Sequence, residues 1–220
     1  MSSFQPVKND TFLRALRREA TDYTPVWLMR QAGRYLPEYR ALRAEKGGFL
    51  ALVYDSKAAA EITLQPIRRF GFDGAILFSD ILIVPYAMGQ DLEFLAGEGP
   101  RLSPRLVDAS LASLKAVPER LGAIYETVKL VRAGLGSDRT LLGFAGSPWT
   151  VATYMVAGQG SKDHHETRAL AYRDTAAFGS LIDGIERPRW PDREDVCHGC
   201  GQRAACGAAG ERLAGSVRRY

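Results

Sequence analysis

The stretch Val26–Arg43, which reads V-W-L-M-R-Q-A-G-R-Y-L-P-E-Y-R-A-L-R, decides how the rest of the chain is interpreted. It opens with an apolar run, Val26–Met29, whose β-branched and aromatic side chains predict a strand buried on both faces. Four arginines follow, with Gly33 between the first two: Arg30, Arg34, Arg40 and Arg43. Guanidinium groups bind carboxylate or phosphate through paired hydrogen bonds, and a glycine lets a ligand approach the backbone closely. The pattern predicts an anion-binding loop at the carboxyl end of a strand. The alternative is a basic surface loop, but aromatic and apolar residues among the arginines argue against it.

Two further strands are expected downstream. Asp73–Asp80 reads D-G-A-I-L-F-S-D, which predicts a turn, an apolar strand and a carboxylate at the end of that strand. Leu141–Ala145 is the third expected strand. The other expected elements are helices at Thr11–Glu19, Pro37–Leu42, Ser56–Phe70, Ser110–Ala133 (interrupted near Pro118), Thr150–Ala157 and His165–Ile185, and a hairpin within Met88–Leu102. Strands that alternate with helices indicate an α/β fold with parallel strands.

In such folds the chemistry lies beyond the carboxyl ends of the strands. Arg30, Asp80 and the segment Trp149–Tyr154 each follow an expected strand, so we expect them to converge at one edge of the sheet. Asp80 is interpreted either as the cap of a turn or partner of an arginine, or as a carboxylate that binds ligand N–H groups and stabilises a developing cation. The hydroxyl of Tyr154 binds a polar ligand in one interpretation, and its ring simply packs in the core in the other.

Composition restricts the class of protein. The chain has 220 residues, 46% of them hydrophobic, and a formal net charge of +4, which is too mild to indicate a nucleic-acid-binding protein. Uninterrupted apolar runs are shorter than a membrane span, and the N-terminus has no secretory pattern. The expected location is therefore the cytoplasm, with no nucleic-acid or membrane partner.

The composition changes abruptly after Arg187. Residues 188–220 contain one leucine and no isoleucine, phenylalanine or methionine, and all three cysteines of the chain: Cys197, Cys200 and Cys206. The spacing of Cys197-His198-Gly199-Cys200 is that of a zinc or redox site. Because the surrounding segment has lost the apolar periodicity of a folded domain, we instead interpret 188–220 as an irregular tail translated in a shifted reading frame.

Five segments together resemble the uroporphyrinogen decarboxylase family over roughly Gln5–Arg187. They read R-Q-A-G-R-Y-L-P-E-Y-R, L-Q-P-I-R-R-F, A-I-L-F-S-D-I-L, G-F-A-G-S-P-W-T and A-T-Y-M-V. The resemblance implies a (β/α)8 TIM barrel of which residues 1–187 form only the N-terminal part, and a non-homologous tail at 188–220. It also implies a cytoplasmic homodimer that needs no metal or organic cofactor.

The family converts the four acetate arms of uroporphyrinogen III to methyl groups, giving coproporphyrinogen III. By resemblance, Asp80 binds the pyrrole N–H groups, and Arg34 and Arg30 join it as catalytic residues. The residues that the resemblance assigns to substrate binding are Arg30, Gln31, Ala32, Gly33, Arg34, Arg43, Asp80 and Tyr154. The later serine and the C-terminal histidine of the family site have no counterpart, so this chain is expected to be inactive or poorly soluble as written. The alternatives are a zinc- and corrinoid-dependent methyltransferase of the same superfamily and a non-catalytic protein that binds porphyrin or another polyanion.

Overall fold

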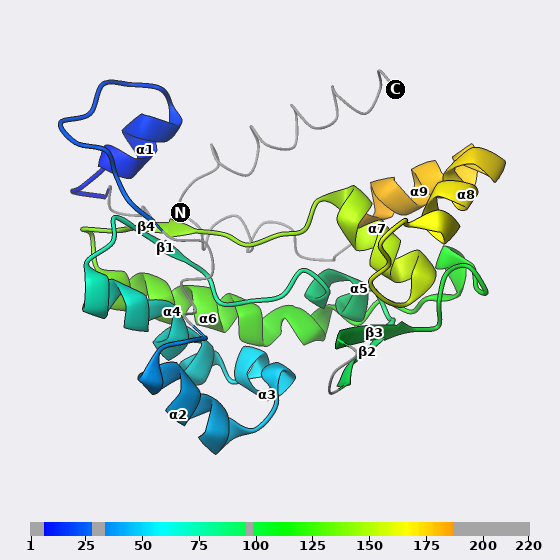
Figure 1. The fold of residues 1–220 in the computed structure, drawn as a ribbon, viewed down its shortest axis with the longest axis horizontal. Coiled ribbons are helices and arrows are strands. Elements are labelled where there is room, and N and C mark those ends of the chain that lie inside the picture. The colour runs from blue at the N-terminus through cyan, green and yellow to red at the C-terminus, as the bar shows by residue number, and fades with distance from the viewer. Residues whose placement is uncertain (1–6, 28–33, 96–98, 187–220) are drawn as a thin grey trace.

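The computed structural model describes residues 7–27, 34–95 and 99–186 (Figure 1). Short strands alternate with helices along this part of the chain. In chain order the elements are α1 (Thr11–Leu16), α2 (Pro37–Lys46), α3 (Phe49–Tyr54), α4 (Ser56–Phe70), β1 (Gly74–Ile76), α5 (Ile83–Ala87), β2 (Asp91–Leu95), β3 (Gly99–Ser103), the 3-10 helices η1 (Leu111–Ser113) and η2 (Pro118–Leu121), α6 (Gly122–Leu135), β4 (Thr140–Leu142), α7 (Pro148–Ala157), α8 (His165–Arg173) and α9 (Thr175–Glu186).

A parallel pair of strands, β1 and β4, organises the fold. Their register places Gly74 opposite Thr140 and Ile76 opposite Leu142. The backbone N–H of Leu77 extends the pairing by donating to the Leu142 carbonyl at 3.0 Å. The expected α/β fold with parallel strands is therefore confirmed.

Helices α4 and α6 pack against one face of this sheet (Figure 1). Ala75 and Leu77 face the helices and form a core with Ala60 of α4 and with Val131 and Leu135 of α6. The limits of α4 follow from its caps. The Asp55 carboxylate accepts the Ala58 N–H at 3.0 Å, and Gly71 ends the helix in the left-handed conformation with φ of 69°.

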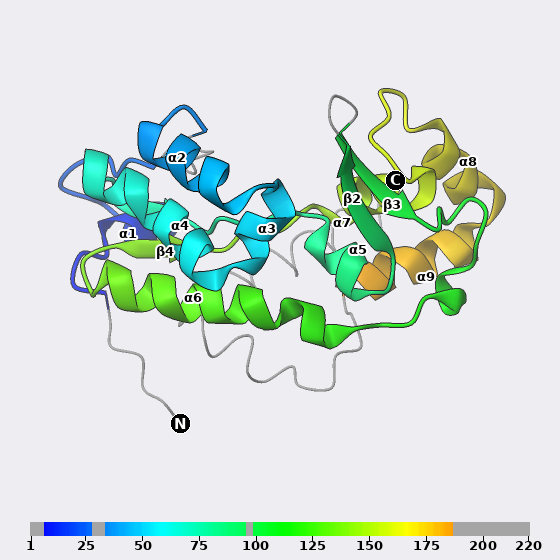
Figure 2. The same cartoon turned by 90° about the horizontal axis from the view of Figure 1, so that it is seen from below.

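A second core joins α5, β3, α7 and α9. Four of its side chains are at most 2% exposed: Leu82, Leu102, Met155 and Leu181. Buried Gln90 ties its parts together, because its amide nitrogen donates to the carbonyls of Pro104 at 2.7 Å and Met155 at 3.1 Å. The antiparallel hairpin of β2 and β3 lies beside α5 and α7, as Figure 2 shows, and confirms the hairpin expected within 88–102.

The expected strand at Val26–Met29 is wrong for its described half. Val26 and Trp27 have no strand conformation, and residues 28 and 29 lie outside the described ranges. Val26 instead forms two hydrogen bonds with Asp73. Its N–H donates to the Asp73 carboxylate at 2.8 Å, and its carbonyl accepts the Asp73 N–H at 3.0 Å. This contact still holds the entrance of the arginine loop beside the start of β1.

Other element limits also differ from expectation: α1 ends at Leu16 and not at Glu19, α2 continues to Lys46, and α7 begins at Pro148. The helix expected at Ser110–Ala133 is irregular before Pro118, because Val117 donates its N–H across to the Ala87 carbonyl at 2.7 Å and leaves the helical path. The helix expected at His165–Ile185 divides at Asp174, whose carboxylate caps the second half by accepting the Ala177 N–H at 2.9 Å. Strand β4 ends before Gly143 and does not reach Ala145. None of the helices in the described ranges is long and apolar enough to cross a bilayer.

Candidate functional site

Asp80 follows β1 in the turn that leads into α5. The backbone N–H of Leu82 donates to its carboxylate at 2.8 Å. Asp80 is half-buried, and this burial raises the pKa of its carboxyl group above its ordinary value. The Leu82 N–H and the positive charge of Arg34 act in the opposite direction, because both favour the ionised form. Asp80 is thus a desolvated carboxylate that gains from any further N–H donor.

Arg34 lies just before α2 and is exposed. Two neighbours fix the backbone after it, because Leu36 and Tyr39 are 2% and 1% exposed. The Tyr39 ring packs edge-on against Phe78, two residues before Asp80, with 6.3 Å between ring centroids. Packing of α2 against the segment after β1 brings Arg34 near enough to Asp80 for its charge to favour the ionised carboxylate.

Arg43 and Arg40 also lie on α2, and both are exposed. Within the described ranges no side chain forms an ion pair with either guanidinium, and no hydrogen bond or ion pair links Arg43 to Asp80. Arg30, Gln31, Ala32 and Gly33, which sequence reasoning placed in the same loop, lie outside the described residues.

Tyr154 comes from α7, the helix that follows β4. Its ring is half-buried against the same core cluster as Ile81, the neighbour of Asp80. A Cβ placed on Gly160 would lie 3.4 Å from the Tyr154 hydroxyl. The loop between β4 and α7 is seated directly on Ile81, since a Cβ placed on Gly146 would lie 3.0 Å from the Ile81 Cβ. The turn that carries Asp80 therefore packs against the loop that leads into the helix of Tyr154, and no hydrogen bond joins the two side chains.

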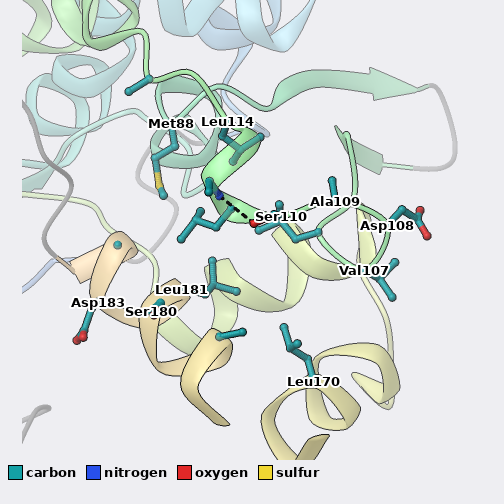
Figure 3. A pocket seen from close by; sticks show the side chains of 16 residues that line it. Met88, Val107, Asp108, Ala109, Ser110, Leu114, Leu170, Ser180, Leu181 and Asp183 are labelled. Carbon is teal, nitrogen blue, oxygen red and sulfur yellow. Dashed lines mark hydrogen bonds between the residues drawn. The ribbon is translucent and has the colours of Figure 1, made fainter. Parts of the chain in front are cut away.

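A groove of about 1350 Å³ lies elsewhere, between residues 106–116 and α9 (Figure 3). The side chains of Met88, Leu114 and Leu181 point toward its hollow. Its lining includes two acidic residues, Asp108 and Asp183, and no basic one among the described residues. Such a surface repels a polycarboxylate, so the groove is not the predicted anion site. Sequence reasoning missed it, because its walls are far apart along the chain and carry no motif.

Metal ligands are not grouped in the described part of the chain, where no set of three His, Cys, Asp or Glu side chains could hold an ion. The Cys197/His198/Cys200 cluster lies outside the described residues. Trp149, the first residue of the segment expected at the site, has ring contacts with Phe178 at 5.7 Å and His164 at 6.5 Å.

A parallel sheet backed by helices, with a carboxylate in the turn after β1 and a guanidinium whose charge acts on it, defines an α/β protein with an acidic and a basic group at one end of the sheet. The family model described as "Uroporphyrinogen decarboxylase (URO-D)" matches residues 7–187, and the chain belongs to this family.

Relatives in two bacteria show how much of the family chain is present. The chain is 76% identical over 173 residues to the uroporphyrinogen decarboxylase of Novosphingobium aromaticivorans. This match covers 79% of this chain and 51% of that protein. It is 71% identical over 180 residues to the uroporphyrinogen decarboxylase of Rhizorhabdus wittichii, covering 82% of this chain and 52% of that protein. The chain therefore spans about half the length of these curated relatives.

The fold is also similar to a solved structure, a methyltransferase from Methanosarcina mazei. The match has a TM-score of 0.63 at 17% sequence identity, and covers 83% of this chain and 53% of that one. At this identity the likeness concerns the fold alone.

Proposed function

We propose that residues 7–187 form one part of the substrate site of a uroporphyrinogen decarboxylase, which converts uroporphyrinogen III to coproporphyrinogen III with release of four molecules of carbon dioxide. The observation that carries this proposal is the position of Asp80, a desolvated carboxylate beyond β1 on which the charge of Arg34 acts. The 76% identity to the Novosphingobium relative supports the choice of reaction.

The substrate carries eight carboxylates around a ring with four inward N–H groups. In the proposal, Arg30, Arg34 and Arg43 bind carboxylates at the rim, and the backbone of Gln31, Ala32 and Gly33 lines the same loop. The exposure of Arg34 and Arg43 supports this role, as does the absence of an ion-pair partner for Arg43 within the described ranges, because an unpaired fork is available to a ligand. Tyr154 contributes a hydroxyl from the β4 side.

Asp80 accepts hydrogen bonds from the pyrrole N–H groups, which favour its ionised form and offset its burial. A proton added to a pyrrole carbon makes that ring cationic, and the Asp80 carboxylate stabilises the cation. The electrons of the acetate C–C bond then flow into the ring as carbon dioxide leaves. A second proton converts the exocyclic methylene to methyl, and the ring carbon gives up the first. Arg34 and Arg30 hold the reacting acetate as permanent cations, since a guanidinium does not deprotonate.

The described sheet is, in this proposal, the first part of a (β/α)8 barrel, and residues 188–220 are a tail read in a shifted frame. The family match that ends at residue 187 and the altered composition beyond it support the second point. The homodimer and the cytoplasmic location implied by the resemblance stay predictions. Resequencing the coding region tests the tail: a single-base correction should restore an apolar strand beyond Arg187, and its failure to do so would refute the frameshift.

The catalytic proposal is tested with a fused protein, in which residues 1–187 are followed by the part of the Novosphingobium relative that this chain does not match. Anaerobic incubation with uroporphyrinogen III should give coproporphyrinogen III with the fused protein and none with the 220-residue chain alone. A folded fused protein that releases no carbon dioxide would overturn the proposed function, and turnover by the 220-residue chain would show that its half of the site suffices.

A further inference from the structure

The hydroxyl of Thr63, in the middle of α4, bonds to the chain two residues before Asp80. Thr63 is 0% exposed, and its hydroxyl donates to the Ala59 carbonyl at 2.9 Å. Because a hydroxyl has one hydrogen, this bond leaves the oxygen free to accept, and it accepts the Phe78 N–H at 3.0 Å. The direction of both hydrogen bonds is therefore fixed.

The Phe78 N–H depends on this bond. The preceding N–H, of Leu77, donates to the Leu142 carbonyl at 3.0 Å, and successive residues of a parallel strand bond to opposite sides. The Phe78 N–H therefore points away from β4, at a residue that is only 6% exposed. A buried N–H without a partner is costly, so the Thr63 hydroxyl fixes the path of the backbone as it leaves β1.

The ring of Phe78 carries this constraint to the segment of Arg34. It packs edge-on against Tyr39 of α2, with 6.3 Å between ring centroids, and against Phe49 of α3, at 5.5 Å. Helices α2 and α3 both lie beside α4, as Figure 2 shows. Phe78 is thus held at its N–H by α4 and at its ring by two helices, one of which begins three residues after Arg34.

We propose that Thr63 is a positioning residue of the candidate site, whose hydroxyl holds Phe78 so that the Asp80 turn stays beside the segment of Arg34. Among the described residues, Arg34 is the charged side chain that acts on Asp80, and Leu82 supplies the N–H bonded to its carboxylate. The Leu82 bond lies within the turn itself, whereas the effect of Arg34 depends on how α2 sits against that turn. The consequence for turnover rests on the proposed function, and the placement of the turn does not.

Two substitutions separate the hydroxyl from the rest of the side chain. Thr63→Val keeps the branched shape but leaves the Phe78 N–H without its acceptor, whereas Thr63→Ser keeps the acceptor. Thr127→Val is the matched control. Thr127 is 1% exposed on α6, and its hydroxyl donates to the Ala123 carbonyl at 2.8 Å, but no N–H of another described element donates to it.

The proton affinity of Asp80 reports the placement of the turn without any turnover. In the full 220-residue chain it is followed by carbon-13 NMR of labelled aspartate carboxyls, with the Asp80 signal assigned by its loss in Asp80→Asn. Thr63→Val should raise the pKa of Asp80, because the Arg34 charge that lowers this pKa acts from farther away. Thr63→Ser and Thr127→Val should leave the pKa unchanged. In the Arg34→Gln background, Thr63→Val should cause no further rise.

The fused protein gives a second readout, and the same titration on it serves where the 220-residue chain does not stay in solution. Thr63→Val should lower kcat/KM for uroporphyrinogen III about tenfold, because the carboxylate and the guanidinium are no longer held in register. The acid limb of kcat/KM should move to higher pH. Thr63→Ser should restore most of the activity, and Thr127→Val should stay within a few-fold of the parent.

An unchanged pKa of Asp80 in folded Thr63→Val would overturn the inference. Equal effects of Thr63→Val and Thr63→Ser would also overturn it, as would a rise of the Asp80 pKa that persists in full without Arg34. The expected pattern of Asp80 pKa values, together with an inactive parent fused protein, would uphold the inference and overturn the proposed function alone. Decarboxylation by a fused protein in which Thr63→Val behaves like the parent would do the reverse.

Discussion

Arg34 lies close enough to Asp80 for its charge to lower the pKa of that carboxyl, although burial leaves the pKa raised overall. The pair joins the segment before α2 to the turn after β1, and the packing of Tyr39 on Phe78 holds the two segments together. This exposed cation beside a half-buried carboxylate is the arrangement on which the proposed substrate site depends.

Replacing Asp80 by asparagine separates function from stability. In the fused protein, Asp80→Asn should lower kcat by about 10²- to 10³-fold, because the amide cannot stabilise a ring cation. Since burial disfavours the ionised carboxylate, the same change should move the urea midpoint upward at pH 7. The amide oxygen can still accept the Leu82 N–H, which retains the turn. Turnover within a few-fold of the parent would remove Asp80 from the mechanism.

The pH dependence of activity should report on Arg34. Because the pKa of Asp80 is raised above its ordinary value, the carboxylate takes up a proton at a higher pH than an ordinary aspartate. The fall of kcat/KM on the acid side should therefore begin at a correspondingly higher pH. Arg34→Gln removes a charge that lowers this pKa, so the acid limb should move to still higher pH. Arg34→Lys retains the charge and should shift the limb less, while KM rises because the bidentate fork is lost. An acid limb that is identical in Arg34→Gln and the parent would contradict the coupling.

Gly146 holds the β4–α7 loop against the site. A Cβ there would lie 2.6 Å from Val151 Cγ2 and 3.0 Å from Ile81 Cβ. Gly146→Ala should therefore destabilise the fused protein by about 1–3 kcal/mol in urea unfolding. Gly143→Ala in the same loop meets nothing within 4 Å and should change stability by about 0.5 kcal/mol or less. Equal effects of the two alanines would mean that the loop is not packed as described.

Asp73 anchors the chain that enters the arginine loop. Burial tends to raise its pKa, but the Tyr23 hydroxyl and the Val26 N–H outweigh it and lower the pKa below its ordinary value. The ionised Asp73 carboxylate therefore stabilises the folded state fully at pH values above its unfolded pKa of about 3.9. This stabilisation is lost as the pH falls through the lower pKa of Asp73 in the folded state. Asp73→Ala should cost about 1–3 kcal/mol at pH 7. Its unfolding free energy should also depend less on pH between 4 and 2 than that of the parent, and an unchanged slope would count against this role.

Local signals predicted much of the fold. Helix α4 begins at Ser56 and ends at Phe70 as expected, because Asp55 and Gly71 cap it through contacts within a few residues. The carboxylate beyond β1 was likewise visible as a polar residue closing an apolar run. Both features depend on neighbours in sequence.

What the sequence did not predict depends on contacts between distant segments. Residues 114–117 leave the helical path because Val117 bonds to Ala87 and because Gly89 approaches the Lys115 backbone so closely that a Cβ would overlap it. The groove between residues 106–116 and α9 arises in the same way. The position of Arg43 relative to Asp80 also depends on how α2 packs, which no local pattern encodes.

A crystal structure of the fused protein with coproporphyrinogen III tests the proposed role of Asp80 most directly. The expected result is a ring with its pyrrole nitrogens within about 3 Å of the Asp80 carboxylate oxygens and a propionate at Arg43. A product ring bound elsewhere, for example in the groove beside α9, with Asp80 facing away from its nitrogens, would contradict that role.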